Sequence, residues 1–308
     1  MLRKIKMLLP NEIKVPSINF NIINKSGEAE AFLEFYNIIN KKHDYHFGHF
    51  LSKNNKITAH IFKNSYSIGT IYLLHGFLDH SGVLSKLINN LLKDNYSIAV
   101  FDLLGHGLSD GAKTEVESFD DYVVIFSDFI KITRSVLKPP YHIIAHSTGT
   151  AVVYDYLNNY DDIFEKVIFA APLVRSKHWQ LAKFSRKITD DIIKDFPRVF
   201  RNVSSDKTFL KFQKYSDPLQ PKKISLKWVK ALYNWNEKIK NYSHLDRELM
   251  IIQGTKDNIV EWKYNLKYFE IMMKKVIIKM IKDGRHQLFN ENKELFAKVF
   301  ECIKEYLK

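Results

Sequence analysis

The sequence predicts a mostly parallel, doubly wound α/β sheet that carries one helical insertion. Short, largely apolar runs suit strands that are buried on both faces of a parallel sheet. Helical patterns separate these runs, and such alternation is typical of doubly wound folds, whose functional groups gather at the carboxyl ends of the strands. A long gap between the fourth and fifth runs breaks the alternation. The strand runs are residues 68–74, 97–101, 141–145, 166–170, 249–252 and 276–281, and the helical patterns are residues 81–92, 119–136, 150–159 and 260–273.

The residues before the first of these runs predict a helix and a hairpin. A helix is expected over residues 28–40, because apolar side chains recur on one face of that segment. Two strand-like stretches, residues 49–51 and 57–62, flank the polar residues 53–56 and predict a β-hairpin.

The long gap, residues 172–248, predicts a cap over the catalytic end of the sheet. It has no clear strand pattern and is expected to form several short helices. It holds 18 Lys and Arg against 8 Asp and Glu, which is most of the chain's net charge of +13. Two interpretations of this positive charge remain. It either reflects codon bias and lies on a solvated surface, or it contacts an anionic membrane or substrate. Nucleic acid is not an expected partner, because no nucleic-acid-binding motif accompanies the charge.

These patterns divide the chain into an extension, a core and a cap. The expected boundaries are an N-terminal extension with a helix at 1–44, an α/β core at 45–171 and 249–308, and the basic helical cap at 172–248.

Composition narrows the classes of protein that remain. An apolar fraction of 45% in 308 residues suits a globular protein with a sizeable core. Cys302 is the only cysteine and lies in a predicted last helix at 294–307, so no intrachain disulfide forms and a reducing compartment fits. The N-terminus lacks the apolar run of a signal peptide, and no stretch approaches 18 apolar residues. We therefore expect a cytoplasmic protein, in peripheral contact with the inner face of a membrane if the basic charge is functional. Oligomeric state is not predicted.

Metals and cofactors are not expected. None of the 12 histidines forms a His-Glu-x-x-His motif or a Cys/His cluster with metal-ligand spacing. The Gly105-His-Gly107 turn lacks the third glycine of a dinucleotide-binding loop.

Ser147 is the predicted nucleophile. The pentapeptide Ala145-His-Ser-Thr-Gly149 follows a predicted strand and precedes a predicted helix, the setting that a nucleophile elbow requires. Positions two before and two after the serine must be small, because strand and helix pass closely there. The alternative is a serine that only caps the following helix.

Asp257 and His286 are the predicted partners of Ser147. A serine hydroxyl needs a base within hydrogen-bond reach, and that base needs an orienting acid. Both residues follow late strands, in the chain order serine, acid, histidine. Asp283 is the competing acid, but it lies three residues before His286 in the same loop and would struggle to reach the imidazole from behind.

The loop His75-Gly-Phe-Leu78 follows another predicted strand and suits an oxyanion hole. The backbone N–H groups of Phe77 and Thr148 are the expected donors. His75 is expected to brace this loop rather than act as a second base, and His146 to line the pocket or pack beside it.

Together these motifs resemble the monoacylglycerol lipase and lysophospholipase branch of the α/β-hydrolases, also catalogued as serine aminopeptidase-like. The turn Asp102-Leu-Leu-Gly-His-Gly-Leu-Ser109 is the most specific match, and Ala145 and the bulky Phe77 are departures. The resemblance implies an α/β-hydrolase fold and hydrolysis of a single-chain acyl ester, a lysophospholipid or monoacylglycerol, through an acyl-enzyme. A small-molecule esterase, a thioesterase, an aminopeptidase and a non-catalytic binding protein on this scaffold remain alternatives.

Overall fold

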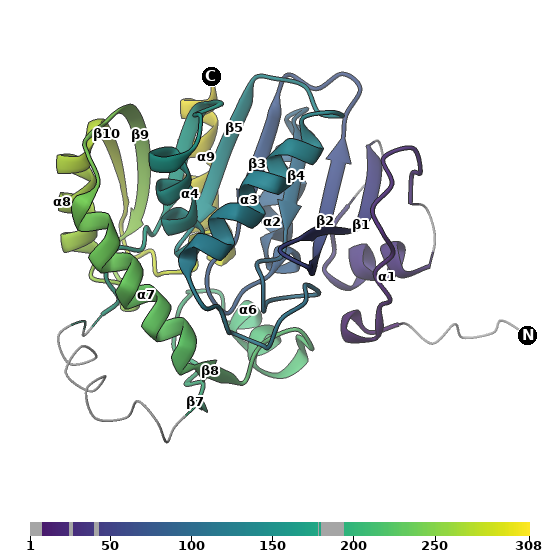
Figure 1. Ribbon diagram of the computed structural model, residues 1–308, viewed down its shortest axis with the longest axis horizontal. Helices are drawn as coiled ribbons and strands as arrows, with labels where there is room; N and C mark the ends of the chain where they lie inside the picture. Colours follow the sequence, from purple (N-terminus) through teal and green to yellow (C-terminus); the bar gives the residue numbers. More distant parts are fainter. Residues whose placement is uncertain (1–7, 25–26, 40–42, 178, 180–193) are drawn as a thin grey trace, which may run out of the picture.

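The computed structural model describes residues 8–24, 27–39, 43–177, 179 and 194–308, and it confirms the predicted doubly wound α/β sheet. Eight strands form one sheet in the order β1-β2-β4-β3-β5-β6-β9-β10 (Figure 1). The β1–β2 and β2–β4 pairs are antiparallel, and the other neighbours are parallel. The strands are β1 Asp44–Ser52, β2 Asn55–Lys63, β3 Thr70–Leu74, β4 Ser97–Phe101, β5 Tyr141–His146, β6 Phe164–Ala170, β9 Leu245–Gly254 and β10 Met273–Ile281.

Helices cover both faces of this sheet. Helices α3, α4 and α8 pack on one face, and α1, α2 and α9 contribute to the apolar cluster on the other. These helices are α1 Glu28–Phe35, α2 Ser85–Lys93, α3 Phe119–Thr133, α4 Thr148–Asn159, α8 Trp262–Met272 and α9 Lys293–Leu307.

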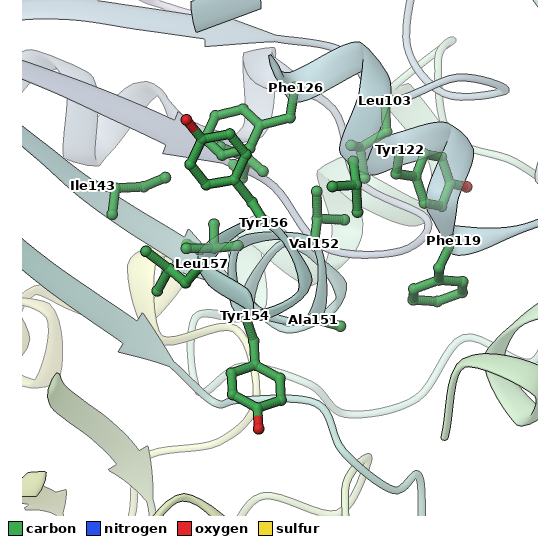
Figure 2. Packing of buried hydrophobic residues seen from close by; sticks show 14 of the residues in the cluster. Leu103, Phe119, Tyr122, Phe126, Ile143, Ala151, Val152, Tyr154, Tyr156 and Leu157 are labelled. Carbon is green, nitrogen blue, oxygen red and sulfur yellow. The ribbon is translucent and has the colours of Figure 1, made fainter. Parts of the chain in front are cut away.

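Aromatic side chains fill the layer between the sheet and helices α3 and α4 (Figure 2). Phe126 of α3 meets Tyr156 of α4 edge to face, with ring centroids 5.1 Å apart, and Ile143 of β5 is fully buried in the same cluster. This packing fixes α4 against β5. It therefore fixes the turn between them, where Ser147 lies.

The N-terminal residues shield the edge of the sheet. The His49 N–H of β1 donates to the Pro16 carbonyl at 2.7 Å, and Ile18 N–H donates back to the His49 carbonyl at 2.9 Å. An open strand edge invites pairing with another chain, and these bonds occupy part of it.

Helix α1 is shorter than the predicted helix at 28–40. It ends at Phe35, and Asn37 adopts a positive φ of 54° that an α-helix does not tolerate. The turn directs Tyr36 inward, where its ring packs on Gly82 and its hydroxyl donates to Asp217 Oδ1 at 2.8 Å.

The described residues between β6 and β9 lie at the carboxyl ends of the parallel strands, below the sheet in Figure 1. Helices form in this segment as predicted, but a two-stranded antiparallel ribbon, which the sequence pattern did not indicate, forms as well. Strands of three residues are too short to leave a periodic signal in a sequence. Part of the segment, residues 178 and 180–193, lies outside the described residues. Its elements are β7 Asp195–Pro197, α6 Lys207–Lys211, β8 Lys223–Ser225 and α7 Leu226–Lys238.

Candidate active site

Ser147 occupies the sharp turn between β5 and α4. Its φ of 49° and ψ of −115° are unusual for a residue with a side chain and cost roughly 1–3 kcal/mol. Its hydroxyl makes no capping bond to α4, which argues against a serine that only caps the helix. A Cβ at Gly149 would come within 2.8 Å of both Leu74 Cβ and the His75 carbonyl oxygen, so the turn requires glycine there.

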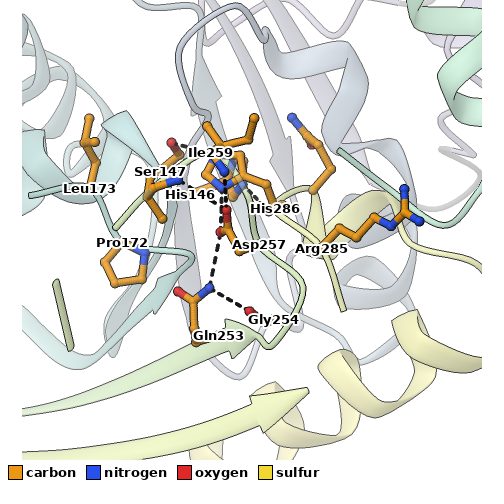
Figure 3. A network of polar contacts seen from close by, with 12 residues as sticks. His146, Ser147, Pro172, Leu173, Gln253, Gly254, Asp257, Ile259, Arg285 and His286 are labelled. Carbon is orange, nitrogen blue, oxygen red and sulfur yellow. Dashed lines mark hydrogen bonds and ion pairs between the residues drawn. The ribbon is translucent and has the colours of Figure 1, made fainter. Parts of the chain in front are cut away.

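A line of hydrogen bonds joins Ser147, His286 and Asp257 (Figure 3). The Ser147 hydroxyl lies 3.0 Å from His286 Nε2, and His286 Nδ1 lies 2.8 Å from Asp257 Oδ2. All three residues are buried. The structure thus brings together the three side chains that were predicted from separate loops. In this arrangement Nδ1 donates to the carboxylate, which leaves Nε2 free to accept the serine proton.

Asp257 is held as a carboxylate by its surroundings. Burial by itself would raise its pKa, but His286 and several hydrogen bonds outweigh burial and leave the pKa lowered. Asp257 Oδ1 accepts from the Ile259 N–H at 2.8 Å, and Oδ2 accepts from Gln253 Nε2 at 3.2 Å. The contribution of Gln253, at the end of β9, is one that sequence reasoning missed (Figure 3).

The loops that carry the acid and the histidine cross closely. The Lys256 N–H donates to the Gly284 carbonyl at 2.8 Å, and a Cβ at Gly254 would collide with that same carbonyl. Asp283 points away from the histidine and pairs with Lys256 at 2.8 Å, with both side chains more than half exposed. The competing acid is therefore not at the site.

The backbone N–H groups of Phe77 and Thr148, the predicted oxyanion donors, lie unpaired beside Ser147 in the part of the chain that the structure describes. Within the described ranges, neither N–H donates a hydrogen bond to any acceptor. His75 braces the Phe77 loop, since its Nε2 accepts from the Leu103 N–H at 2.9 Å and its Nδ1 donates to the Gly76 carbonyl at 2.8 Å. Burial lowers the pKa of His75. A neutral imidazole with both nitrogens engaged does not serve as a second base.

A second polar group, not foreseen from the sequence, lies behind the triad. His146 Nε2 donates to the His286 carbonyl at 2.9 Å, and its Nδ1 lies 3.6 Å from Asp79 Oδ2. Asp79 also accepts from Gln287 Nε2 at 2.7 Å. These contacts link the Phe77 loop to the His286 loop. Asp79, His146 and Gln287 are neighbours in sequence of predicted site residues, but their spacing in the sequence does not predict that they come together.

Ser147 and His286 open into a pocket of about 470 Å³. Its walls are mostly apolar and aromatic and come from the loops at the ends of the core strands, from helix α7, and from the β7–β8 ribbon with the residues that follow β7. Four cationic side chains and the carboxylate of Asp79 also border it. The apolar members include Leu173, Trp179, Trp228, Leu232, Ile259 and Val260.

The described part of the chain holds neither a metal-binding cluster nor a membrane-spanning helix. Within it, no group of three or more His, Cys, Asp or Glu side chains is placed to hold a metal ion. Among the same residues, no helix is long and apolar enough to cross a membrane.

Several known proteins are similar to this chain in sequence. Residues 66–293 match the family model described as serine aminopeptidase, S33. The chain is 24% identical over 266 residues to the monoglyceride lipase of Saccharomyces cerevisiae, covering 78% of this chain and 84% of the yeast protein. It is 21% identical over 252 residues to a monoglyceride lipase homolog of Monkeypox virus, covering 79% and 90%. It is also 21% identical over 266 residues to a probable lysophospholipase of Haemophilus influenzae, covering 76% and 82%.

Solved structures share the fold. A soluble variant of the yeast monoglyceride lipase with a substrate analog superposes with a TM-score of 0.72 at 18% identity, covering 88% of this chain and 96% of that one. The monoacylglycerol lipase of Paleococcus ferrophilus superposes with a TM-score of 0.69 at 22% identity, covering 82% and 98%. The sheet order and the helices on both faces agree with an α/β-hydrolase fold, and the family match spans most of the chain. The chain belongs to the serine aminopeptidase S33 family of α/β-hydrolases.

Proposed function

We propose that this chain hydrolyses carboxylic esters of single-chain lipids, of the lysophospholipid or monoacylglycerol type, through an acyl-enzyme on Ser147. The observation that carries the proposal is the hydrogen-bonded line from Ser147 through His286 to Asp257 in the wall of a largely apolar pocket. An acyl chain needs such a wall, and the ester carbonyl needs such a nucleophile.

The reaction follows from these positions. Ser147 Oγ attacks the ester carbonyl while His286 Nε2 takes the hydroxyl proton, and Asp257 stabilises the resulting imidazolium. The amides of Phe77 and Thr148 receive the negative charge on the carbonyl oxygen. His286 then gives its proton to the leaving alcohol, which departs and leaves the acyl group on Ser147. A water molecule, deprotonated by His286, attacks this acyl-enzyme; the bond to Ser147 Oγ then breaks, His286 returns the proton to Oγ, and the fatty acid is released.

We assign residues 172–248 the role of a cap that supplies the acyl pocket and contacts anionic lipid. Helix α7 contributes Trp228, Leu232 and Tyr233 to the pocket. Beside it, Phe196 and Val199 are exposed apolar side chains in a strongly basic segment. Basic residues at an anionic membrane surface contribute about 1 kcal/mol each. The proposal predicts sedimentation with vesicles that contain phosphatidylserine and little sedimentation with neutral vesicles; equal sedimentation with both would contradict it.

An aminopeptidase is the second candidate, and one observation favours it. Asp79 borders the pocket, is buried, and its Oδ1 has no hydrogen-bond partner in the described part of the chain. Such a carboxylate suits the ammonium group of a peptide N-terminus. The predominance of apolar walls favours the lipid ester, so amino-acid amides belong in the substrate panel as the competing class.

Labelling with a fluorophosphonate probe tests the mechanism. Wild type and Ser176→Ala are expected to label, and Ser147→Ala is not; Ser176 is a matched control because it borders the same pocket away from the triad. Turnover of a lysophospholipid and monoacylglycerol panel should fall ~10⁴- to 10⁶-fold in Ser147→Ala. Undiminished turnover in that variant would refute the acyl-enzyme on Ser147.

A further inference from the structure

Phe77 lies flat against Trp228. Their ring centroids are 3.6 Å apart and their planes differ by 13°. Phe77 belongs to the loop that follows β3, whereas Trp228 belongs to helix α7, 151 residues later in the chain. The stack therefore joins the segment between β6 and β9 to the loop that carries a candidate oxyanion donor.

The opposite side of this loop rests on the nucleophile turn. A Cβ at Gly76 would come within 2.8 Å of His146 Nδ1 and 3.0 Å of Ser147 Cβ, so the backbone of the loop has no room to move toward the serine. The next residue but one, Leu78, has a positive φ of 65°. The loop is thus held between the elbow on one side and the Trp228 ring on the other.

Further rings hold both partners of the stack. The edge of Phe77 meets the His106 ring at 5.5 Å, and Trp228 meets the Phe119 ring at 5.9 Å. Trp228 is only 7% exposed. Since the Phe77 N–H makes no hydrogen bond in the described structure, the direction of this N–H depends on how the side chain and the flanking backbone are packed.

We propose that Trp228 is a positioning residue for the oxyanion hole. By stacking on Phe77 it keeps the Phe77 N–H aimed at the reacting carbonyl, so the hole is complete only while α7 is seated on the loop. The inference rests on the proposed function, because it assumes that the Phe77 amide stabilises the oxyanion. It gives α7 a part in the rate of reaction that is separate from contact with the acyl chain.

The bulky residue at position 77 also gains an explanation. Only the backbone of Phe77 contacts the reacting atoms in this mechanism, so a small residue would suffice there. The aromatic side chain gives α7 a flat surface to press on, and the contact removes apolar surface of both rings from water.

The test compares two tryptophans of α7. Trp228→Ala removes the stack, and Trp235→Ala is the matched control, because Trp235 is 2% exposed on the same helix, packs on Phe119 and does not border the pocket. Acetate and laurate esters of the same alcohol separate positioning from acyl contact, since acetate is too short to depend on the apolar wall. Active-site titration corrects each rate for the fraction of folded enzyme.

We expect Trp228→Ala to lower kcat about 10- to 100-fold for both esters, with KM for acetate unchanged. The Ki of a trifluoromethyl ketone, which mimics the oxyanion, should rise by the same factor. Trp228→Phe should recover most of the rate. Phe77→Ala should lose as much as Trp228→Ala, and the double variant should lose no more than either one, because both remove the same contact.

Three results would overturn the proposal. A loss confined to the laurate ester would mean that Trp228 acts only through the acyl chain. An equal loss in Trp235→Ala would mean that α7 acts only through stability, and additive losses in the double variant would mean that the two rings act separately. If Trp228→Ala does not fold, Trp228→Leu keeps apolar volume without a flat ring and takes its place. Failure of the proposed function is distinct, because wild type would then show no turnover that depends on Ser147.

Discussion

Replacing Asp257 by asparagine tests the proposed triad sharply, because the chain offers as a control a second aspartate that lies three residues before the same histidine in the sequence. Asp257 lies 2.8 Å from His286 Nδ1. Asp283 is close in sequence to His286, but its carboxylate pairs with Lys256 in solvent. The two substitutions remove the same charge, but only that of Asp257 is buried and contacts the imidazole.

The structure determines how an asparagine at position 257 would sit. The δ1 atom of Asp257 accepts two backbone N–H groups, from Ile259 at 2.8 Å and Val260 at 3.3 Å. Those donors are fixed, so the amide oxygen would take this place and the amide NH₂ would face His286. Gln253 Nε2, which donates both to Asp257 Oδ2 and to the Gly254 carbonyl, would lose its acceptor at position 257.

An NH₂ group facing Nδ1 reverses the tautomer of His286. Nδ1 would then have to accept a hydrogen bond, the proton would move to Nε2, and Nε2 could no longer take the proton of Ser147. A wrong tautomer of this kind costs ~10⁴-fold in kcat in serine hydrolases with the same triad logic. For Asp283→Asn we expect a change of less than about twofold, since exposed ion pairs contribute little.

The assay is steady-state hydrolysis of one ester by both variants, with each preparation titrated by a fluorophosphonate and its secondary structure compared with that of wild type. A folded Asp257→Asn protein that keeps more than about a tenth of the wild-type kcat would contradict the tautomer argument. A larger loss in Asp283→Asn than in Asp257→Asn would show that the acid has been assigned to the wrong residue.

Two further predictions concern stability. Burial by itself lowers the pKa of His80, but Asp217 at 2.9 Å outweighs burial and raises it, while the pKa of Asp217 is lowered. The His80–Asp217 pair therefore stabilises the fold fully between the pKa values that the two groups have in the unfolded chain, about 3.9 for aspartate and 6.5 for histidine. This contribution is lost as pH rises through the pKa of His80 in the folded protein, or as pH falls through that of Asp217. Urea unfolding of His80→Gln should show a deficit of about 1.5–3 kcal/mol near pH 5.5 that shrinks near pH 9; a deficit independent of pH would contradict this. Gly149→Ala should lower the unfolding free energy by about 1–3 kcal/mol, because its Cβ would press on Leu74 and the His75 carbonyl; an unchanged melting temperature would show that helix and strand can separate.

The sheet could be predicted because its strands are buried on both faces. Strand β4 matches the predicted residues 97–101 at both ends, and β5 extends the predicted run by one residue. Strand β9 begins earlier than predicted. Its first residues, Leu245 to Glu248, are polar or half exposed, so no apolar run marks them as part of the strand. Apolar runs report burial, and a strand that extends beyond the core carries no such signal.

The candidate triad could be predicted because each member follows an apolar run at the same edge of the sheet. Parallel strands bring their carboxyl ends together, so order along the chain and position after a strand were sufficient for Ser147, Asp257 and His286. Contacts that depend on side-chain direction were not accessible in this way. Gln253 and Asp79 reach the site through rotamers that packing selects, and no spacing rule encodes them.

The loop at 75–80 shows why the rest of the site escapes a reading of the sequence alone. Trp228 presses on Phe77, while Asp217 of the same inserted segment binds His80 and accepts a hydrogen bond from Tyr36 near the N-terminus. About forty to 150 residues of sequence separate these partners from the loop. Each partner belongs to a segment whose own hydrophobic pattern is weak. An oxyanion hole needs N–H groups that stay unpaired until the reaction, so the loop cannot be held by hydrogen bonds from those N–H groups. Among the described residues, the loop is held by the Asp79 N–H bond to the Gly76 carbonyl and by side-chain contacts that include His75 on the Leu103 N–H, Phe77 on Trp228 and His80 on Asp217. The N-terminal extension and the insertion therefore both contact this loop, through Tyr36 on His80 and through Trp228 and Asp217, although neither contributes a member of the triad.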